Sequence, residues 1–189
     1  MQVNANTLRK GHVLDYNGKL WLVTKGEIMS PGKGASVIQV EMRDVRTGVK
    51  NNIRFRTQEI VEKVQLQEHE MQFLFAADDV YTFMDQENFE QLTVPKDIIG
   101  DPVVFLAEAM ICKVMTYEGV ALSVELPSTV TLELTEADPV VKGQTASSSY
   151  KPAMLSNGVR ILVPPFIEAG TRVVVNTTDG SYVERAQKA

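Results

Sequence analysis

The sequence predicts an all-β protein built from three consecutive small β-barrels. Short strand-like runs separated by turn residues recur along the 189 residues, and no long helical period interrupts them. The apolar fraction of 44% is that of a folded core. Composition shifts near Val64 and again near Pro127. We therefore expect three domains of similar size, over residues 1–64, 65–127 and 128–189.

The first predicted domain begins with a β-hairpin. Two strand-like runs flank the pair Asn17-Gly18, whose tolerance of positive φ suits a two-residue turn. Apolar and polar residues then alternate from Ser36 to Met42, which predicts a half-buried strand. A second alternating run places Arg54 and Arg56 opposite inward-facing apolar residues. The pattern predicts a small twisted barrel with guanidinium groups on one outer face.

The other two predicted domains repeat this style. In the middle domain, strand-like runs flank turns at Asp78-Asp79 and Glu118-Gly119. Between them, Asp101 is expected as the N-cap of a short helix that has Pro102 at its first position and continues to Glu108. In the third domain, strands are expected over residues 129–134, 159–163, 173–177 and 182–183.

Charge is distributed unevenly over these domains. Residues 1–64 carry 11 basic and 6 acidic side chains, a net charge of +5, whereas residues 65–127 carry 2 and 12, a net charge of -10. Residues 128–189 are neutral, and the whole chain has a net charge of -5. Because the local field governs docking more than the total charge does, the basic end is expected to meet a polyanion. Chance segregation of surface charge is the alternative.

Several classes of protein find no support in the sequence. The single cysteine, Cys112, cannot form an internal disulfide and is expected in the core. With no apolar leader and no long apolar run, the chain is expected in the cytoplasm and away from membranes. His12 and His69 lack partners at zinc-finger spacing, so neither a metal nor a cofactor is expected. The sequence shows no convergent set of titratable groups, so an enzyme is not expected.

The strongest local feature is the loop Ser30-Pro31-Gly32-Lys33-Gly34 between two predicted strands. Proline fixes one dihedral angle and the two glycines relax their neighbours. Lys33 is therefore expected at the tip of the loop, with little bulk on either side. A plain hairpin turn with a solvated lysine is the alternative that the loop by itself leaves open.

This loop does not fit a nucleotide-binding P-loop. Five residues separate Gly26 from Gly32 instead of four, and Gly34 stands where Ser or Thr would hold magnesium. A strand pattern follows where a helix would begin. An NTPase is therefore not expected.

Two motifs make the chain resemble bacterial elongation factor P over essentially its whole length. The first is the segment 31–34, followed by the strand that reaches Arg43 and by the turn Thr47-Gly48. The second motif comprises Lys151-Pro152-Ala153, Gly158, Ile161, Val163-Pro164, Phe166, Gly170, Val175-Asn176-Thr177 and Tyr182. The middle stretch 87–91 also resembles the family. At Gln144, Thr171 and Val174 the chain departs from the residues that relatives often carry.

The resemblance implies a fold and a function. It implies an SH3-like, KOW-type first domain and two OB-folds, with an L-shaped outline similar to a transfer RNA. It implies a translation elongation factor, not an enzyme, that binds the ribosome between the peptidyl and exit sites and stabilises the peptidyl-tRNA. It further implies that the factor stimulates peptide bond formation and so relieves stalling at consecutive prolines. Lys33 matches the family's loop-tip lysine, which points to the acceptor end of this tRNA and often carries a post-translational extension.

The expected partners follow from charge and from the resemblance. They are the ribosome with its RNA, the peptidyl-site tRNA, a stalk protein near the exit site that meets the acidic middle domain, and an enzyme that modifies Lys33. A monomer is expected. Candidate contacts to the RNA backbone are Arg43, Arg46, Lys50, Arg54 and Arg56 in the first domain. The resemblance adds Gly143, Gln144, Thr145, Tyr182 and Arg185 in the third domain.

A different class of function stays open beside this one. A free-standing OB-fold RNA-binding protein or RNA chaperone would present exposed aromatic side chains interleaved with basic residues, on which bases stack. Most aromatic residues in this chain fall on positions that are predicted to face inward. The sequence therefore favours the elongation factor.

Overall fold

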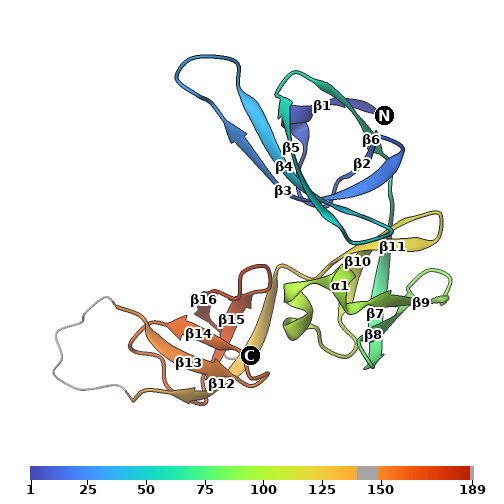
Figure 1. Cartoon of the computed structure of the whole chain (residues 1–189). Coiled ribbons are helices and arrows are strands. Elements are labelled where there is room, and N and C mark those ends of the chain that lie inside the picture. The colour runs from blue at the N-terminus through green and yellow to red at the C-terminus, as the bar shows by residue number, and fades with distance from the viewer. Residues whose placement is uncertain (140–148, 188–189) are drawn as a thin grey trace. The chain divides into compact units, whose positions relative to one another are not determined.

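The structure is a computed structural model that describes residues 1–139 and 149–187, and its three β-sheets are drawn in Figure 1. The chain forms two compact units. One combines Met1–His69 with Val114–Ser123, and the other combines Glu70–Lys113 with Val124–Ala189. The all-β prediction is confirmed, since the elements other than strands are short helical turns. The expected three domain boundaries stay a prediction.

The first sheet contains six strands in the order β1-β6-β2-β3-β4-β5, and each neighbouring pair is antiparallel. The hairpin at Asn17-Gly18 is confirmed, with φ angles of 54° and 75° at these two residues. A 3₁₀ turn, Ala5–Thr7, follows β1. The strands are β1 Gln2–Asn4, β2 Val13–Tyr16, β3 Lys19–Met29, β4 Val37–Asp44, β5 Lys50–Arg56 and β6 Ile60–Val64.

One face of this sheet forms the first core. Ile38, Val40 and Met42 are buried on β4, as the alternation predicted, and Phe55 is buried on β5. Further buried members of the same cluster are Leu8, Leu14 and Trp21. Because period-two alternation sends every second side chain to the opposite face, the residues between these positions face outward.

The second sheet contains five strands in the order β11-β10-β7-β8-β9. Its two predicted turns are confirmed, since Asp78 and Asp79 have φ angles of 49° and 61°, and Glu118-Gly119 joins β10 to β11 with φ angles of 50° and 79°. The strands are β7 Gln67–Ala77, β8 Val80–Asp85, β9 Gln91–Pro95, β10 Ile111–Tyr117 and β11 Val120–Glu125.

The expected helix from Asp101 to Glu108 was wrong in its cap and its length. A one-turn helix, α1 (Lys96–Ile99), comes first, and the segment Asp101–Phe105 that follows is a 3₁₀ helix. Gly100, with a φ of 77°, occupies the N-cap position, so no side chain caps the helix. The helix ends early because Leu106 is already extended and its N–H bonds the carbonyl of Val103 in 3₁₀ fashion.

The third sheet contains five strands in the order β14-β13-β12-β15-β16, so β14 and β16 are its edges. Every expected run is a strand, although each run differs from its strand by one or more residues at one or both ends. The sequence did not predict β13, because it holds Pro152, which lacks a donor for the sheet. The strands are β12 Thr129–Ala137, β13 Lys151–Leu155, β14 Arg160–Val163, β15 Arg172–Asn176 and β16 Tyr182–Arg185.

One turn architecture closes a hairpin in each of the three sheets. Asp44, Asp85 and Asn176 are each the last residue of a strand, and each Oδ1 accepts the N–H two residues later at 2.8 Å. Each of their carbonyls accepts the N–H four residues later, at 2.8 to 3.0 Å. That fourth residue has a left-handed φ in all three turns. The residues there are Gly48 (75°), Phe89 (62°) and Gly180 (74°).

Candidate functional site

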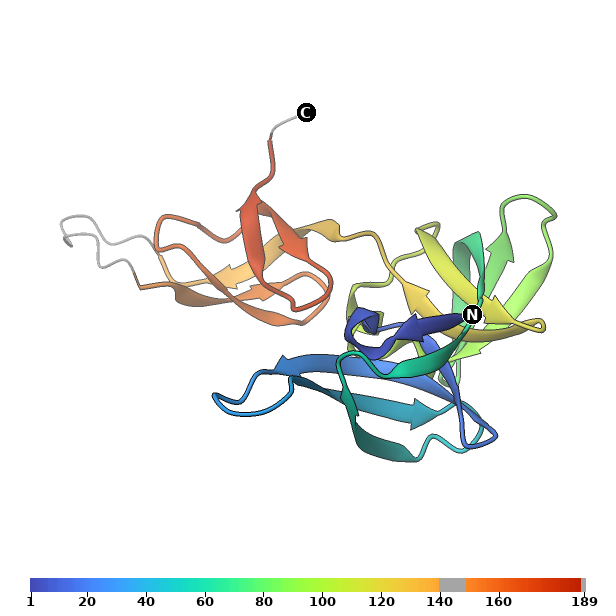
Figure 2. The ribbon, with the colours of Figure 1, turned by 90° about the horizontal axis from the view of Figure 1, so that it is seen from above.

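Lys33 lies in the loop that joins the two longest neighbouring strands of the first sheet. β3 has 11 residues, and its last pair with β4 is Met29 opposite Val37. Figures 1 and 2 both show the end of this hairpin projecting beyond the rest of its sheet. The lysine side chain is exposed there. The expected position at a loop tip therefore holds.

Short polar contacts and a glycine shape the loop. The hydroxyls of Ser30 and Ser36 lie 3.1 Å apart, and the Ser36 carbonyl accepts the N–H of Thr57 at 3.1 Å. Gly34 has a φ of 114°, a conformation that residues with a Cβ rarely adopt. Within the described parts of the chain, no hydrogen bond or ion pair holds the Lys33 ammonium. The group is therefore free to meet a partner.

Two large apolar side chains flank the base of this loop, and sequence reasoning missed them. Ile28 is 50% exposed and Met29 is 41% exposed, at the end of β3 next to the loop. Ile28 pairs with Ile38, which is fully buried. β3 is exposed from Thr24 to its end, so the strand leaves the core after Val23 and carries Ile28 and Met29 into solvent. The exposure of these two apolar residues has no signal in the sequence itself.

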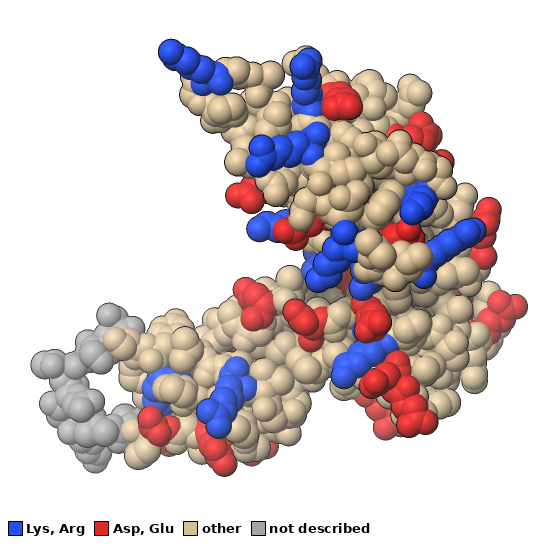
Figure 3. All heavy atoms as spheres, viewed as in Figure 1, with Lys and Arg blue, Asp and Glu red and all other residues tan. Residues whose placement is uncertain are grey.

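The cations of β4 and β5 share the outer face of the first sheet. Arg54 pairs with Gln39, and Arg43 pairs with Lys50. Gln39 and Arg43 alternate with the buried residues of β4, so their partners across the strand pair also face away from the core. Arg56 lies on the same face, two pairs closer to the loop than Arg54. On the side seen in Figure 3, Lys and Arg side chains stand out along this sheet.

The five predicted cations do not form one cluster around Lys33. Arg54 and Arg56 lie at the loop end of β5, whereas Arg43 and Lys50 lie at the far end of the same strand pair. Arg46 lies beyond them in the β4–β5 turn, where its backbone N–H donates to Asp44. Acidic groups interrupt the face, since β3 and β4 also carry the exposed side chains of Glu27 and Glu41. The cations therefore form a dispersed row along the sheet.

In the third sheet, a β-bulge brings two predicted site residues to one face. Tyr182 pairs with Val175 and Arg185 pairs with Val173, because the register shifts between these pairs. Without the shift, residues three apart on a strand would face opposite sides. Burial raises the pKa of Tyr182, and the Arg185 charge opposes that shift. The ring of Tyr182 packs edge to face against Tyr150, with centroids 6.4 Å apart.

The remaining third-domain residues are less informative. Gly143, Gln144 and Thr145 lie outside the described residues. Thr171 accepts the N–H of Leu134 at 2.9 Å through its carbonyl. Val174 pairs with residues on both neighbouring strands of β15. Thr171 and Val174 thus take part in the sheet through their backbones, and no contact described for them involves a side chain.

Groups that the sequence assigned to no site show ordinary structural roles. His12 accepts the N–H of Arg9 through Nδ1 at 3.0 Å, and its pKa is lowered by burial, with Lys63 and Arg9 adding to the effect. Cys112 is buried on β10, which raises the pKa of its thiol to about 11. In the described ranges, no three His, Cys, Asp or Glu side chains converge as metal ligands, and no helix is long and apolar enough to cross a membrane.

Three family descriptions match consecutive parts of the chain. They are "Elongation factor P (EF-P) KOW-like domain" over residues 4–61, "Elongation factor P (EF-P) OB domain" over residues 66–124, and "Elongation factor P, C-terminal" over residues 130–185. The expected fold class, with a KOW-type domain followed by OB-folds, is thereby confirmed.

Similar proteins of known name cover the chain from end to end. Elongation factor P of Rhodospirillum centenum is 64% identical over 187 residues, which are 99% of this chain and 100% of that protein. Elongation factor P of Paramagnetospirillum magneticum is 54% identical over 98% of both chains. A solved structure, "Eukaryotic translation initiation factor 5A from Methanococcus jannaschii", is 21% identical with a TM-score of 0.44, over 67% of this chain and 92% of that one.

Proposed function

Since the chain belongs to the elongation factor P family of translation factors, we propose that it binds the ribosome between the peptidyl and exit sites and relieves stalling at consecutive prolines. It acts there by stabilising the peptidyl-tRNA and stimulating peptide bond formation. The factor supplies no catalytic group of its own. Proline is a poor nucleophile and rigid, so holding the peptidyl-tRNA end in a productive geometry lowers the entropic part of the barrier.

The observation that carries this proposal is the placement of Lys33. It stands at the end of a projecting hairpin, and no described residue holds its ammonium group. A lysine ammonium is a compact cation on a flexible stem, so it suits phosphates and 2′-hydroxyls at the acceptor end of a tRNA. We expect a dedicated enzyme to extend this lysine, because an added amine-bearing group lengthens its reach.

Charge supports an orientation of the domains toward their partners. The outer face with Arg54 and Arg56 follows the tRNA backbone from the base of the loop. The middle domain, with 12 acidic and 2 basic side chains over residues 65–127, avoids RNA and meets a basic stalk protein of the ribosome. The third domain contacts RNA through Tyr182 and Arg185. The protein acts as a monomer in the cytoplasm.

A reporter with and without consecutive prolines tests the proposal. Lys33→Ala should stall on the proline reporter as strongly as translation without the factor, and should leave the proline-free reporter unchanged. Lys10→Ala, which removes another exposed lysine in the turn before β2, is the matched control and should translate normally. Normal read-through of prolines by Lys33→Ala would refute the mechanism.

Mass spectrometry of the protein purified from its own host tests the modification. The intact mass and the mass of the peptide that contains Lys33 should both exceed the values calculated from the sequence by the same amount. An unmodified peptide would show that the bare lysine performs the function.

A further inference from the structure

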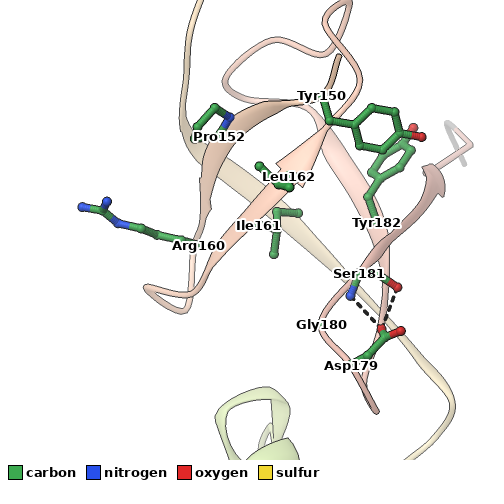
Figure 4. Close-up of a pocket in the computed structure, with 9 residues that line it drawn as sticks. All are labelled: Tyr150, Pro152, Arg160, Ile161, Leu162, Asp179, Gly180, Ser181 and Tyr182. Carbon is green, nitrogen blue, oxygen red and sulfur yellow. Dashed lines mark hydrogen bonds between the residues drawn. The ribbon is translucent and has the colours of Figure 1, made fainter. Parts of the chain in front are cut away.

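A hollow of about 560 Å³ lies between the two edge strands of the third sheet, β14 and β16 (Figure 4). This volume falls within the range of roughly 300–1,000 Å³ that is typical of ligand sites. Its walls come from Leu162 on β14, from Tyr182 on β16, and from Tyr150 just before β13. Sequence reasoning named only Tyr182 among them.

One end of the hollow offers an aromatic surface. The rings of Tyr150 and Tyr182 lie side by side there in Figure 4, with an interplanar angle of 87°. Tyr150 is 53% exposed and Leu162 is 58% exposed, so both leave apolar surface uncovered. An edge-to-face pair leaves ring faces free, and a planar ring of a ligand can stack on them.

The opposite end of the hollow offers only hydrogen-bond acceptors. Asp179 Oδ1 accepts both the N–H and the hydroxyl of Ser181, at 2.9 and 2.6 Å, as the dashed lines in Figure 4 mark. These bonds lower the pKa of Asp179, so its carboxyl group is ionised at neutral pH. The hydroxyl hydrogen of Ser181 is already used. Asp179 Oδ2 and Ser181 Oγ can therefore only accept, and a ligand must bring donors to them.

We propose that this hollow binds an unpaired nucleobase of single-stranded RNA, and that it prefers bases with an exocyclic amino group, such as cytosine, over uracil. The base stacks against the tyrosine pair, and its amino group donates to Asp179. This inference rests on the proposed function, in which the third domain contacts RNA on the ribosome. It names the part of the RNA that the domain binds.

The position of Arg160 agrees with an RNA ligand. Asp179 repels phosphate, so the sugar-phosphate chain must leave the hollow on another side. Arg160 is the cation among the lining residues, and in Figure 4 it extends from β14 away from the tyrosines. It can reach a phosphate that follows the bound base. It also disfavours the main alternative occupant, an arginine side chain of a protein, which would itself stack on tyrosine and pair with Asp179.

The test is a titration of the full chain with fluorescein-labelled hexacytidylate and hexauridylate, followed by fluorescence anisotropy at low salt. We expect the cytidine oligomer to bind about tenfold tighter than the uridine oligomer. Tyr150→Ala should weaken cytidine binding about tenfold, because one stacking contact is lost, whereas Tyr150→Phe should retain it. Phe166→Ala removes an aromatic side chain that is 61% exposed outside the hollow, and it should change nothing.

Two further variants separate recognition of the base from attraction of the phosphate. Asp179→Asn should abolish the preference for cytidine, because an amide can also donate to the carbonyl of uracil. Arg160→Gln should weaken both oligomers equally and reduce the salt dependence of binding by about one counterion. Equal affinities of the two oligomers for the unchanged protein would overturn the proposal, as would equal effects of Tyr150→Ala and Phe166→Ala.

A competition experiment distinguishes the two possible occupants. Cytidine monophosphate should displace the labelled oligomer, and N-acetylarginine amide should not. Displacement by the arginine compound alone would overturn the assignment to RNA in favour of a protein partner. Because no ribosome is present in these titrations, their failure leaves the proline reporter unaffected, and a failure of Lys33 in that reporter leaves base binding unaffected.

Discussion

Arg56 pairs with Val37 across β5 and β4, so a guanidinium group stands beside the residue at which the Lys33 loop returns to the sheet. Arg54 pairs with Gln39 two residues further along, about 7 Å away along the strand. The two cations thus mark a path from the sheet toward the tip of the hairpin. Their role in binding the ribosome can be separated from that of cations at the far end.

Reversing both charges, Arg54→Glu with Arg56→Glu, should weaken binding to purified ribosomes and flatten its salt dependence by about two counterions. Cosedimentation over a series of salt concentrations measures both effects. Lys10→Glu is the control, since Lys10 is an exposed cation that is not among the candidate RNA contacts and should change the affinity little. If this single reversal weakened binding as much as the double reversal did, the loss would reflect net charge and not the positions of Arg54 and Arg56.

Local signals in the sequence predicted those elements whose geometry is local. Asn17-Gly18 requires positive φ at both residues, and the two-residue turn follows from this chemistry alone. The strand around Pro152 was missed because proline lacks a backbone N–H and so argues against a strand. In the structure, Pro152 pairs with Leu162 on β14.

The arrangement of the candidate sites depends on pairing between distant strands. The shared face of Tyr182 and Arg185 results from a register shift against β15, which no pattern within β16 reveals. In the sheet order β12 and β15 separate β13 from β16, so Tyr150 and Tyr182 meet only because the sheet curls and brings its β14 edge close to β16. Sequence reasoning could therefore name Lys33 and Tyr182 but not the hollow beside Tyr182.

The stability of the first sheet should depend on the ionisation of Asp44. Its pKa is lowered, chiefly because its carboxylate accepts the backbone N–H of Arg46, while burial acts in the opposite direction. A lowered pKa stabilises the folded state above the ordinary value of 3.8, and this contribution is lost as the pH falls through the folded pKa. Asp44→Asn should therefore flatten the acid side of the stability profile.

Fluorescence of Trp21 can report this effect, because Trp21 pairs directly with Asp44 across β3 and β4. Urea unfolding between about pH 5 and about pH 2 gives the profile for each variant. Asp15→Asn, at an exposed position on β2, is the control and should retain the slope of the unchanged protein. An unaltered slope in Asp44→Asn would mean that other carboxylates govern the acid transition.

The buried thiol of Cys112 should resist alkylation in the native protein. Only the thiolate reacts, and a pKa of about 11 leaves very little thiolate at neutral pH. Iodoacetamide should therefore modify Cys112 slowly in buffer and rapidly in concentrated urea, as mass spectrometry can follow. A cysteine placed at the exposed turn residue, Ser156→Cys, should react quickly under both conditions. Fast native modification of Cys112 would indicate that β10 opens readily.

Phe89 occupies the left-handed position that Gly48 and Gly180 occupy in the two related turns, with a φ of 62° and 68% of its surface exposed. A side chain with a Cβ disfavours this conformation by about 1–2 kcal/mol, and an exposed ring recovers little of that through burial. Phe89→Asn should therefore stabilise the β8–β9 hairpin by about 0.5–1 kcal/mol, measured by hydrogen exchange of its amides. Gly48→Ala is the inverse control and should destabilise its own turn by roughly 1 kcal/mol. Lower protection in Phe89→Asn would show instead that the ring contributes contacts worth more than the strain.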